Sequence, residues 1–164
     1  MNINLIRKQL VCLLLLGAMS VSVAGNKKVF NAAAGKYDCT LDGSYTVNTG
    51  TISEYFLDGT AALMRLPRGK GKGKTQFTIA DVLFNYKFKI NRVKVSRNKK
   101  KVRYWGVGSL VNADAGINAD GIIRITAKRK GRNKWIVRSR ALMSGVYADV
   151  APMEVNTKIN GKQR

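Results

Sequence analysis

The chain contains no histidine among its 164 residues. Ser–His and Cys–His nucleophile pairs are therefore excluded, and so is every histidine-ligated zinc site. Acidic residues are scarce too: nine are scattered along the chain, against 30 basic residues. A solvated strand edge explains the closest pair, Asp38 and Asp42. Because no arrangement of acid, base and nucleophile emerges, the sequence predicts a protein that is not an enzyme and uses no metal or cofactor.

The N-terminal apolar run, Leu10–Leu16, falls short of the ~20 residues that span a bilayer. It follows Arg7 and Lys8 and precedes small residues at 20–25, the pattern of a cleaved secretory signal peptide. A membrane anchor is the rival interpretation. We expect residues 1–25 to be removed after Ala24 or Gly25. Residues 26–164 would then form a single domain, exported by a bacterial cell to the periplasm or the medium.

Cysteine is nearly absent as well. Cys12 leaves with the signal peptide, and Cys39 alone remains. The exported compartment permits disulfides, but a lone thiol cannot form one within its own chain. We interpret Cys39 as a small buried hydrophobe. The alternatives are intermolecular pairing and nucleophilic chemistry, which would need a nearby Lys or Arg to activate the thiolate.

What the chain does have is apolar residues at every second position, the pattern of half-buried antiparallel strands. Helical spacing is weak everywhere. After Ile90 the apolar parity changes, which indicates either a bulge near Asn91-Arg92 or a tight turn before a separate short strand. The alternating segments are 37–41, 84–90, 102–105, 123–128, 135–141 and 153–159.

Turn signals separate these segments at Asp42-Gly43, Asp58-Gly59, Arg97-Asn98-Lys99, Asp120-Gly121 and Gly131-Arg132-Asn133. Short strands with regular turns predict an all-β fold. We expect a single antiparallel β-barrel or β-sandwich of about eight or nine strands with meander connections.

The positive charge is concentrated in one region. Residues 65–140 contain 22 basic and three acidic residues, a net charge of +19, whereas residues 26–64 carry −1 and residues 141–164 carry +1. In a meander, the loops 98–101 and 128–134 would lie at one end of the sheet and the loop 112–120, with two of the three acids, at the other. The sequence therefore predicts a cationic face and a cationic end.

The residues predicted to bind a polyanion belong to this region. Within it, residues 67–75 resemble a phosphate-binding P-loop only in their Gly-Lys-Thr ending, because Arg68 replaces the first glycine and no helix follows. A flexible cationic loop that contacts phosphate or sulfate without specificity is the preferred interpretation. The candidate residues are Lys70, Lys72, Lys74, Lys87, Lys89, Lys99, Lys100, Lys101, Arg103, Arg124, Lys128, Arg129, Lys130, Arg132, Lys134, Arg138 and Arg140.

Trp105 shares the outward parity of Arg103. It is either a tryptophan packed under a neighbouring segment or a stacking platform for a base or sugar ring. The basic residues also have a plain alternative, a face kept cationic for solubility only.

Three functions remain open. The first is an exported module that docks electrostatically on lipopolysaccharide, an anionic polymer, anionic lipid or, without specificity, DNA. The second is a β-barrel carrier of an apolar or lipid-like ligand, with Phe84, Tyr86, Phe88, Tyr104 and Trp135 lining its interior. The third is a secreted assembly subunit or interaction protein, joined through Cys39 or an exposed edge strand.

Overall fold

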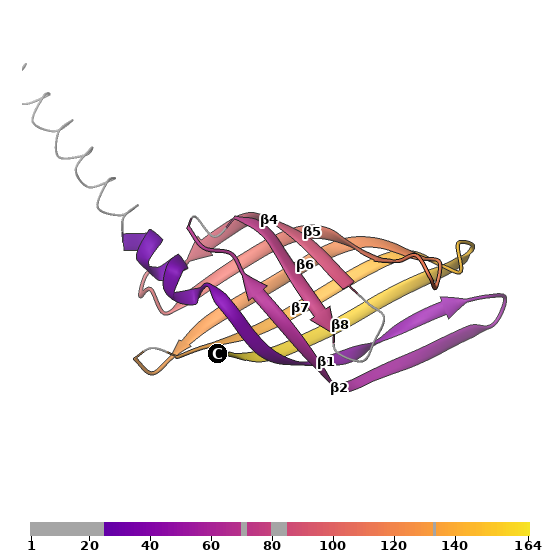
Figure 1. Ribbon diagram of the computed structural model, residues 1–164, viewed down its shortest axis with the longest axis horizontal. Coiled ribbons are helices and arrows are strands. Elements are labelled where there is room, and N and C mark those ends of the chain that lie inside the picture. Colours follow the sequence, from indigo (N-terminus) through magenta and orange to yellow (C-terminus); the bar gives the residue numbers. More distant parts are fainter. Residues whose placement is uncertain (1–24, 70–71, 80–84, 133) are drawn as a thin grey trace, which may run out of the picture.

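The computed structural model describes residues 25–69, 72–79, 85–132 and 134–164. Apart from Gly25, the predicted signal peptide lies outside the described residues. Each strand pairs with the next in antiparallel register, and β8 also pairs with β1, so that hydrogen bonding runs round a closed barrel (Figure 1). The prediction of an all-β antiparallel fold with meander connections is confirmed. The strands are β1 (Gly35–Asn48), β2 (Ile52–Leu66), β3 (Gly73–Ile79), β4 (Asn85–Val95), β5 (Lys101–Asn112), β6 (Ile117–Lys130), β7 (Lys134–Tyr147) and β8 (Ala151–Gln163).

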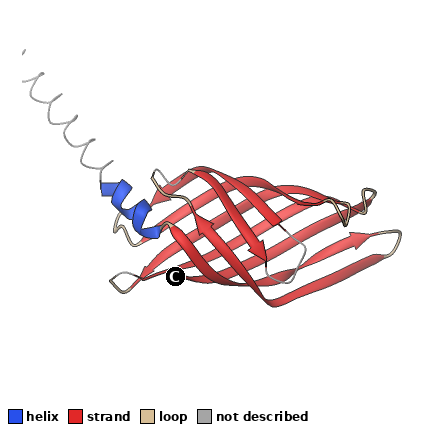
Figure 2. Cartoon of the chain, in the orientation of Figure 1, coloured by secondary structure: helices blue, strands red, loops and turns tan. Residues whose placement is uncertain are grey.

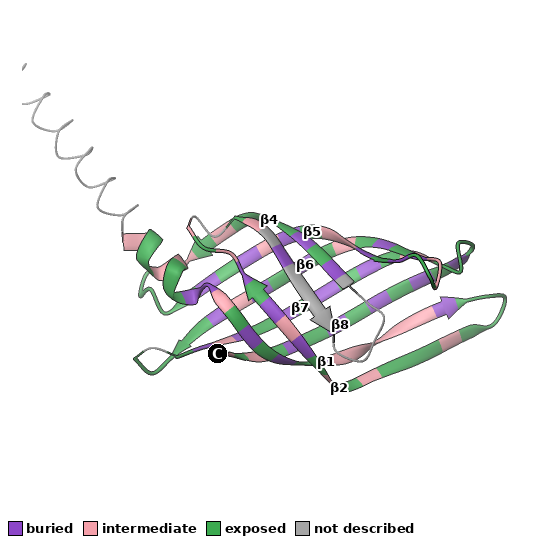
Figure 3. Ribbon diagram, in the orientation of Figure 1, coloured by how far each residue is buried: buried purple, intermediate pink, exposed green. Residues whose placement is uncertain are grey.

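The side chains alternate between the barrel interior and the outer surface, as the bands of Figure 3 show. The six alternating segments found in the sequence lie in β1, β4, β5, β6, β7 and β8, apart from residue 84, which is outside the described residues. Their inward positions are buried, with Tyr104 completely inaccessible and Phe88 at 1% exposure. An eight-stranded barrel is just wide enough for its own side chains to fill it. Every charged side chain on these strands is therefore left on the outside.

Glycines inside the strands make room for this packing. Gly108 pairs with Phe88, and a Cβ at Gly108 would lie 2.6 Å from the Phe88 Cα. A Cβ at Gly121 would lie 2.6 Å from the Met143 Cα on the neighbouring strand. Glycine at such points lets two backbones approach closely where the sheet coils.

Three of the predicted turns are wrong, because their glycines lie inside strands. Asp42-Gly43 lies inside β1, Asp58-Gly59 inside β2 and Asp120-Gly121 inside β6. Gly43 occupies a register shift at φ +149°, where a Cβ would lie 2.8 Å from the Thr157 Cα. The Gly59 amide donates to the Asp42 Oδ1 at 3.0 Å across the same irregularity. Asp42-Gly43 and Asp58-Gly59 therefore form an irregularity within paired strands, and Asp120-Gly121 continues β6 in regular register. The predicted connections at 97–99 and 131–133 do join strands.

The parity change after Ile90 is a bulge. The register between β4 and β5 shifts between Ile90 and Arg92, and β4 continues without a break to Val95. Val93 then packs against the core, and Arg92 and Lys94 are exposed. The alternative of a turn followed by a separate strand is wrong.

Three elements were missing from the sequence prediction: β2, β3 and a helix over residues 25–33 (Figure 2). The first part of β2 pairs with β1 but contains no buried residue before Ala62, so it shows no clear alternation. In the region compared with a P-loop, the Gly-Lys-Thr ending begins strand β3 and is not followed by a helix within the described residues 73–79.

The helix lies at the end of the barrel where β1 begins (Figure 2). Ala33 is completely buried, and Phe30 packs against the core cluster. The Tyr37 hydroxyl donates to the Ala33 carbonyl at 2.7 Å, and the Gln163 Nε2 donates to the Ala32 and Ala34 carbonyls at 3.1 and 2.8 Å. These bonds satisfy carbonyls that a helix end leaves without partners, and they attach the helix to both the first and the last strand.

The contact between Cys39 and Gly161 tests the packing of the barrel. A Cβ at Gly161 would overlap the Cys39 Sγ and lie 2.9 Å from the Asp38 carbonyl oxygen. Gly161→Ala should lower the free energy of unfolding by about 1–3 kcal/mol, the usual cost of overpacking. Chemical denaturation measures this cost. In a Cys39→Ala background it should be clearly smaller, because the sulfur is gone. An equal cost in both backgrounds would mean that this contact does not limit the packing.

Candidate polyanion-binding face

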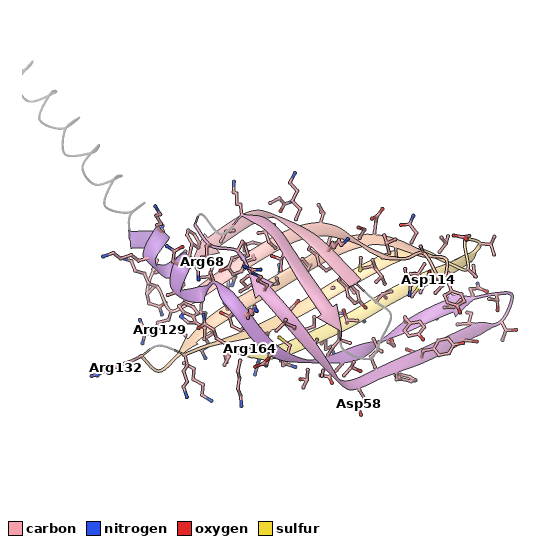
Figure 4. All side chains as sticks on the ribbon, viewed as in Figure 1. Asp58, Arg68, Asp114, Arg129, Arg132 and Arg164 are labelled. Carbon is pink, nitrogen blue, oxygen red and sulfur yellow. The ribbon has the colours of Figure 1, made fainter. Side chains whose placement is uncertain are left out.

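The two ends of the barrel carry opposite charge. The connections after β2, β4 and β6 lie at one end together with residue 164, and those after β1, β5 and β7 lie at the other. Figure 4 shows Arg68, Arg129, Arg132 and Arg164 at the first end, called here the cationic end, and Asp114 towards the opposite one. The predicted polarity of the sheet is confirmed by this topology.

Hydrogen bonds hold the β4–β5 connection at the cationic end. In the β4–β5 loop, the Ser96 hydroxyl donates to the Asn98 Oδ1 at 2.7 Å, and the Lys100 amide donates to the same oxygen at 3.2 Å. The Arg129 amide donates to the Lys100 carbonyl at 2.8 Å, which ties this loop to β6. The lysines of the loop are therefore presented from a defined backbone, so little of that backbone's freedom remains to be lost on binding.

The outer surface of β4–β8 forms the second part of the site. Cross-strand pairing brings its cations into rows that run perpendicular to the strands, with about 4.8 Å between neighbouring strands. One row contains Arg92, Trp105, Arg124, Arg140 and Lys158. We call the whole set the cationic face: Arg92, Lys94, Lys101, Arg103, Arg124, Lys128, Arg138, Arg140, Lys158 and Lys162, all of them exposed.

Most cations of this face are not neutralised by the protein itself. Among the described residues, the only salt bridge joins the Arg164 Nε to the Asp38 Oδ1 at 2.6 Å, at the β1 edge of the surface. The Arg140 Nε donates to a neutral partner, the Asn156 Oδ1, at 3.4 Å. The acids that lie on the outside of β6 and β8, Asp120 and Glu154, belong to a row nearer the opposite end. Two cations at the β8 margin, Lys158 and Lys162, lie in register with Asp42 and Asp38 of β1. The rest of the face, on β4–β7, presents positive charge that no acid in register compensates.

The structure brings most of the predicted binding residues to this face and the cationic end. Lys70 and the side chain of Lys74 lie outside what the structure describes. Lys87 and Lys89 of β4 are exposed as well, but the cross-strand rows to which they belong lie nearer the opposite end of the barrel. The remaining predicted residues are all exposed: Lys72, Lys99, Lys100, Lys101, Arg103, Arg124, Lys128, Arg129, Lys130, Arg132, Lys134, Arg138 and Arg140.

Several cations of the site were missed in the sequence. Arg92 and Lys94 face outward because of the β4 bulge, and the parity change after Ile90 was the signal that could have placed them. Lys158 and Lys162 lie on β8, paired with Arg140 and Ile136 of β7. No local pattern reveals these two, because their position depends on where the last strand pairs.

Trp105 is half-buried and lies on the outer surface between two arginines. The Arg92 Cζ is 5.0 Å from its ring centroid and the Arg124 Cζ is 5.9 Å away, both within cation–π range. It is less enclosed than the core tryptophan Trp135, which is 3% exposed. Trp105 is therefore a surface ring held in place by guanidinium groups.

The Cys39 thiol lies in the barrel wall. The side chain is buried, and its Sγ contacts the Tyr37 carbonyl oxygen at 3.5 Å. Burial raises the pKa of the Cys39 thiol to about 11. A thiol that is protonated and shielded in this way is a poor nucleophile and a poor partner for intermolecular pairing, which supports its interpretation as a small hydrophobe.

Other kinds of site are not indicated. The part of the chain that the structure describes contains no group of three or more cysteine, aspartate or glutamate side chains able to hold a metal ion. It also contains no helix long and apolar enough to cross a membrane.

Comparison with known proteins gives no match. No family model, no curated protein and no solved structure is significantly similar to this chain. Its function must therefore be argued from its own residues.

Like-charge repulsion on the cationic face should make the fold sensitive to salt. Raising sodium chloride from about 20 to 200 mM shortens the Debye length, and we expect the melting temperature to rise by about 2–4 °C, equivalent to about 1 kcal/mol. Calorimetry measures this shift. The triple variant Arg103→Gln/Lys128→Gln/Arg138→Gln should gain less from salt than the wild type. An equal gain would show that repulsion at these residues does not destabilise the fold.

Cys39 should resist alkylation in the folded protein. At pH 8 a thiol whose pKa is about 11 has about 100-fold less thiolate than one whose pKa is about 9. Iodoacetamide should therefore modify native Cys39 at least 100-fold more slowly than the urea-unfolded chain, as followed by mass spectrometry. The folded-state rate should rise as the pH approaches 11. Rapid alkylation of the native protein at pH 8 would contradict this burial.

Proposed function

We propose that this protein is an exported, bacterial polyanion-binding β domain, which docks on envelope or extracellular anions through the cationic face and the cationic end. The observation that carries the proposal is the array of exposed cations on β4–β8, arranged in adjacent rows that meet acids in register only at the β8 margin. Cleavage of residues 1–25 during export is part of this proposal, as is the periplasmic or extracellular location.

Binding would be driven by counterion release. Each anionic group that pairs with a lysine or arginine of the face frees condensed counterions, and the summed field steers the approach of the polyanion. The barrel holds its cations about 5 Å apart across strands and about 7 Å apart along them. This array suits any polymer or surface with closely spaced anions. The array has no feature that would recognise a particular base or a particular order of sugars.

The packed interior favours polyanion binding over the carriage of an apolar ligand inside the barrel. The expected lining residues Tyr86, Phe88, Tyr104 and Trp135 are all buried in one core cluster; Phe84 lies outside the described residues. The hollows found among the described residues are lined largely by outward-facing side chains.

The geometry also favours this function over the two remaining alternatives. Assembly through Cys39 would require an accessible thiol, and this thiol is buried. A charge that served solubility alone would be spread over the surface, because concentration in one place adds self-repulsion without adding solubility. Here the cations gather at one end and on one face, and Asp114, Asp120 and Asp149 lie at or near the other end.

A pair of matched variants tests whether the location of charge matters. Arg103→Gln/Lys128→Gln/Arg138→Gln lowers the net charge by three on the cationic face, and Asn48→Asp/Thr49→Asp/Asn118→Asp lowers it equally at exposed positions of the opposite end. The first variant should bind lipopolysaccharide, polyphosphate and DNA about 10-fold or more weakly at about 50 mM salt, and its log–log salt slope should be shallower by about two to three.

The second variant is the control. Its affinity should remain close to that of the wild type, because its added acids lie far from the contact surface. If about six anionic groups are engaged, wild-type affinity should fall about a thousandfold between 50 and 200 mM salt. Equal losses in the two variants, or binding that hardly changes with salt, would contradict the proposal.

A further inference from the structure

The outer surface carries a row of exposed aliphatic side chains directly beside the cationic face. Val107 of β5 pairs with Ile122 of β6, which pairs in turn with Leu142 of β7. Their side chains are 49%, 59% and 41% exposed. Outward positions of an antiparallel sheet are normally polar, and a contiguous apolar strip on a soluble surface marks a contact with something outside the chain. We call these three residues the aliphatic row.

The aliphatic row adjoins the row that contains Trp105 and its arginines. Trp105, Arg124 and Arg140 each lie two positions along the strand from Val107, Ile122 and Leu142 respectively, so the two rows run in parallel. Trp105, Arg124, Arg140 and the aliphatic row line a hollow of about 410 Å³ on the outer surface. Beyond Trp105, towards the cationic end, come the remaining lysines and arginines of the cationic face.

The order along the strands is thus cations first, then tryptophan with arginines, then aliphatic side chains. A soluble polyanion could occupy the cations but has no apolar surface to cover the aliphatic row. A phospholipid bilayer presents both parts, anionic headgroups with an acyl boundary beneath them. Tryptophan prefers that boundary, and arginine can bury its stem there while its guanidinium group stays with the phosphates.

We propose that the partner of the cationic face is the surface of an anionic phospholipid bilayer, into whose interface the aliphatic row and Trp105 insert while the cations pair with the headgroups. This inference rests on the proposed polyanion-binding function and names its partner. The acids Asp120 and Glu154, on the far side of the aliphatic row, set the limit of the contact. The outer surface of β5–β7 therefore lies against the membrane, and the acidic end of the barrel stays in water.

The test compares two kinds of anion and two triple variants of the mature chain. The probes are vesicles of phosphatidylcholine with about 30 mol% phosphatidylglycerol, and soluble inorganic polyphosphate. The test variant is Val107→Thr/Ile122→Thr/Leu142→Thr, which removes apolar surface but keeps charge and β-propensity. The control is Ile52→Thr/Val111→Thr/Val150→Thr, at other exposed apolar positions, which are 70%, 52% and 80% exposed.

We expect the wild type and the control to co-sediment equally with the anionic vesicles. The test variant should partition about 10-fold or more weakly, since it loses the apolar contact, while its affinity for polyphosphate stays within about twofold because no charge has changed. Trp105 emission in the wild type should shift to the blue on vesicle binding and be quenched by lipids brominated near the headgroup boundary. Circular dichroism and melting curves confirm that each variant is folded.

The other outcomes separate this inference from the proposed function. Undiminished vesicle binding by the test variant, or no change in tryptophan emission, would overturn the membrane contact and leave a polyanion-binding face. Parallel loss of vesicle and polyphosphate binding would overturn the specific role of the aliphatic row. A change of oligomeric state in the test variant alone would assign the row to a second copy of the chain instead. Failure of the wild type to bind either probe would overturn the proposed function itself.

Discussion

The volume inside the barrel is the constraint on which the rest of this structure depends. Eight strands enclose a space that their own side chains fill, so a large residue such as Phe88 lies opposite a position without a side chain, Gly108. No charged group can enter this space without losing its hydration at a high cost. The basic residues of the alternating strands are therefore directed outward, and the packing of the core determines where the charge can appear.

Strand pairing then turns outward residues into a surface. The bulge after Ile90 restores Val93 to the core and, by the same shift, aligns Arg92 with Trp105. Closure of the sheet places Lys158 of β8 beside Arg140 of β7, although 18 positions separate them in the sequence. The cationic face is thus a product of register. No single strand would form the face alone. A one-residue slip in the pairing of β4 with β5, or of β7 with β8, would turn charged side chains towards the core.

Much of this arrangement follows from the sequence, because alternation is a local signal. It located β1 and β4–β8, the outward parity of Arg103, Arg124 and Arg138, and the opposite ends of the connections. It failed where the local signal is ambiguous. Asp120-Gly121 has the composition of a turn. Its glycine instead lies inside a strand, where the backbone of Met143 on another strand is too close for a Cβ. The strand β2 has few buried positions. The nine-residue helix over 25–33 is held by Gln163, which is distant in the sequence, and by Tyr37, which no sequence signal singles out.

The concentration of charge itself argues for a function, because it opposes folding. Positive groups held about 5–7 Å apart on neighbouring strands repel one another in the native state, and the unfolded chain relieves that repulsion by separating them. Screening by salt therefore acts in opposite directions on the two equilibria: it stabilises the fold and weakens the complex with an anion. A surface selected for stability would distribute its cations or pair them with acids. This one keeps most of them adjacent and without acids in register, beside a half-buried tryptophan and an exposed aliphatic row. The energetic cost of that arrangement is recovered only when an anionic partner covers it.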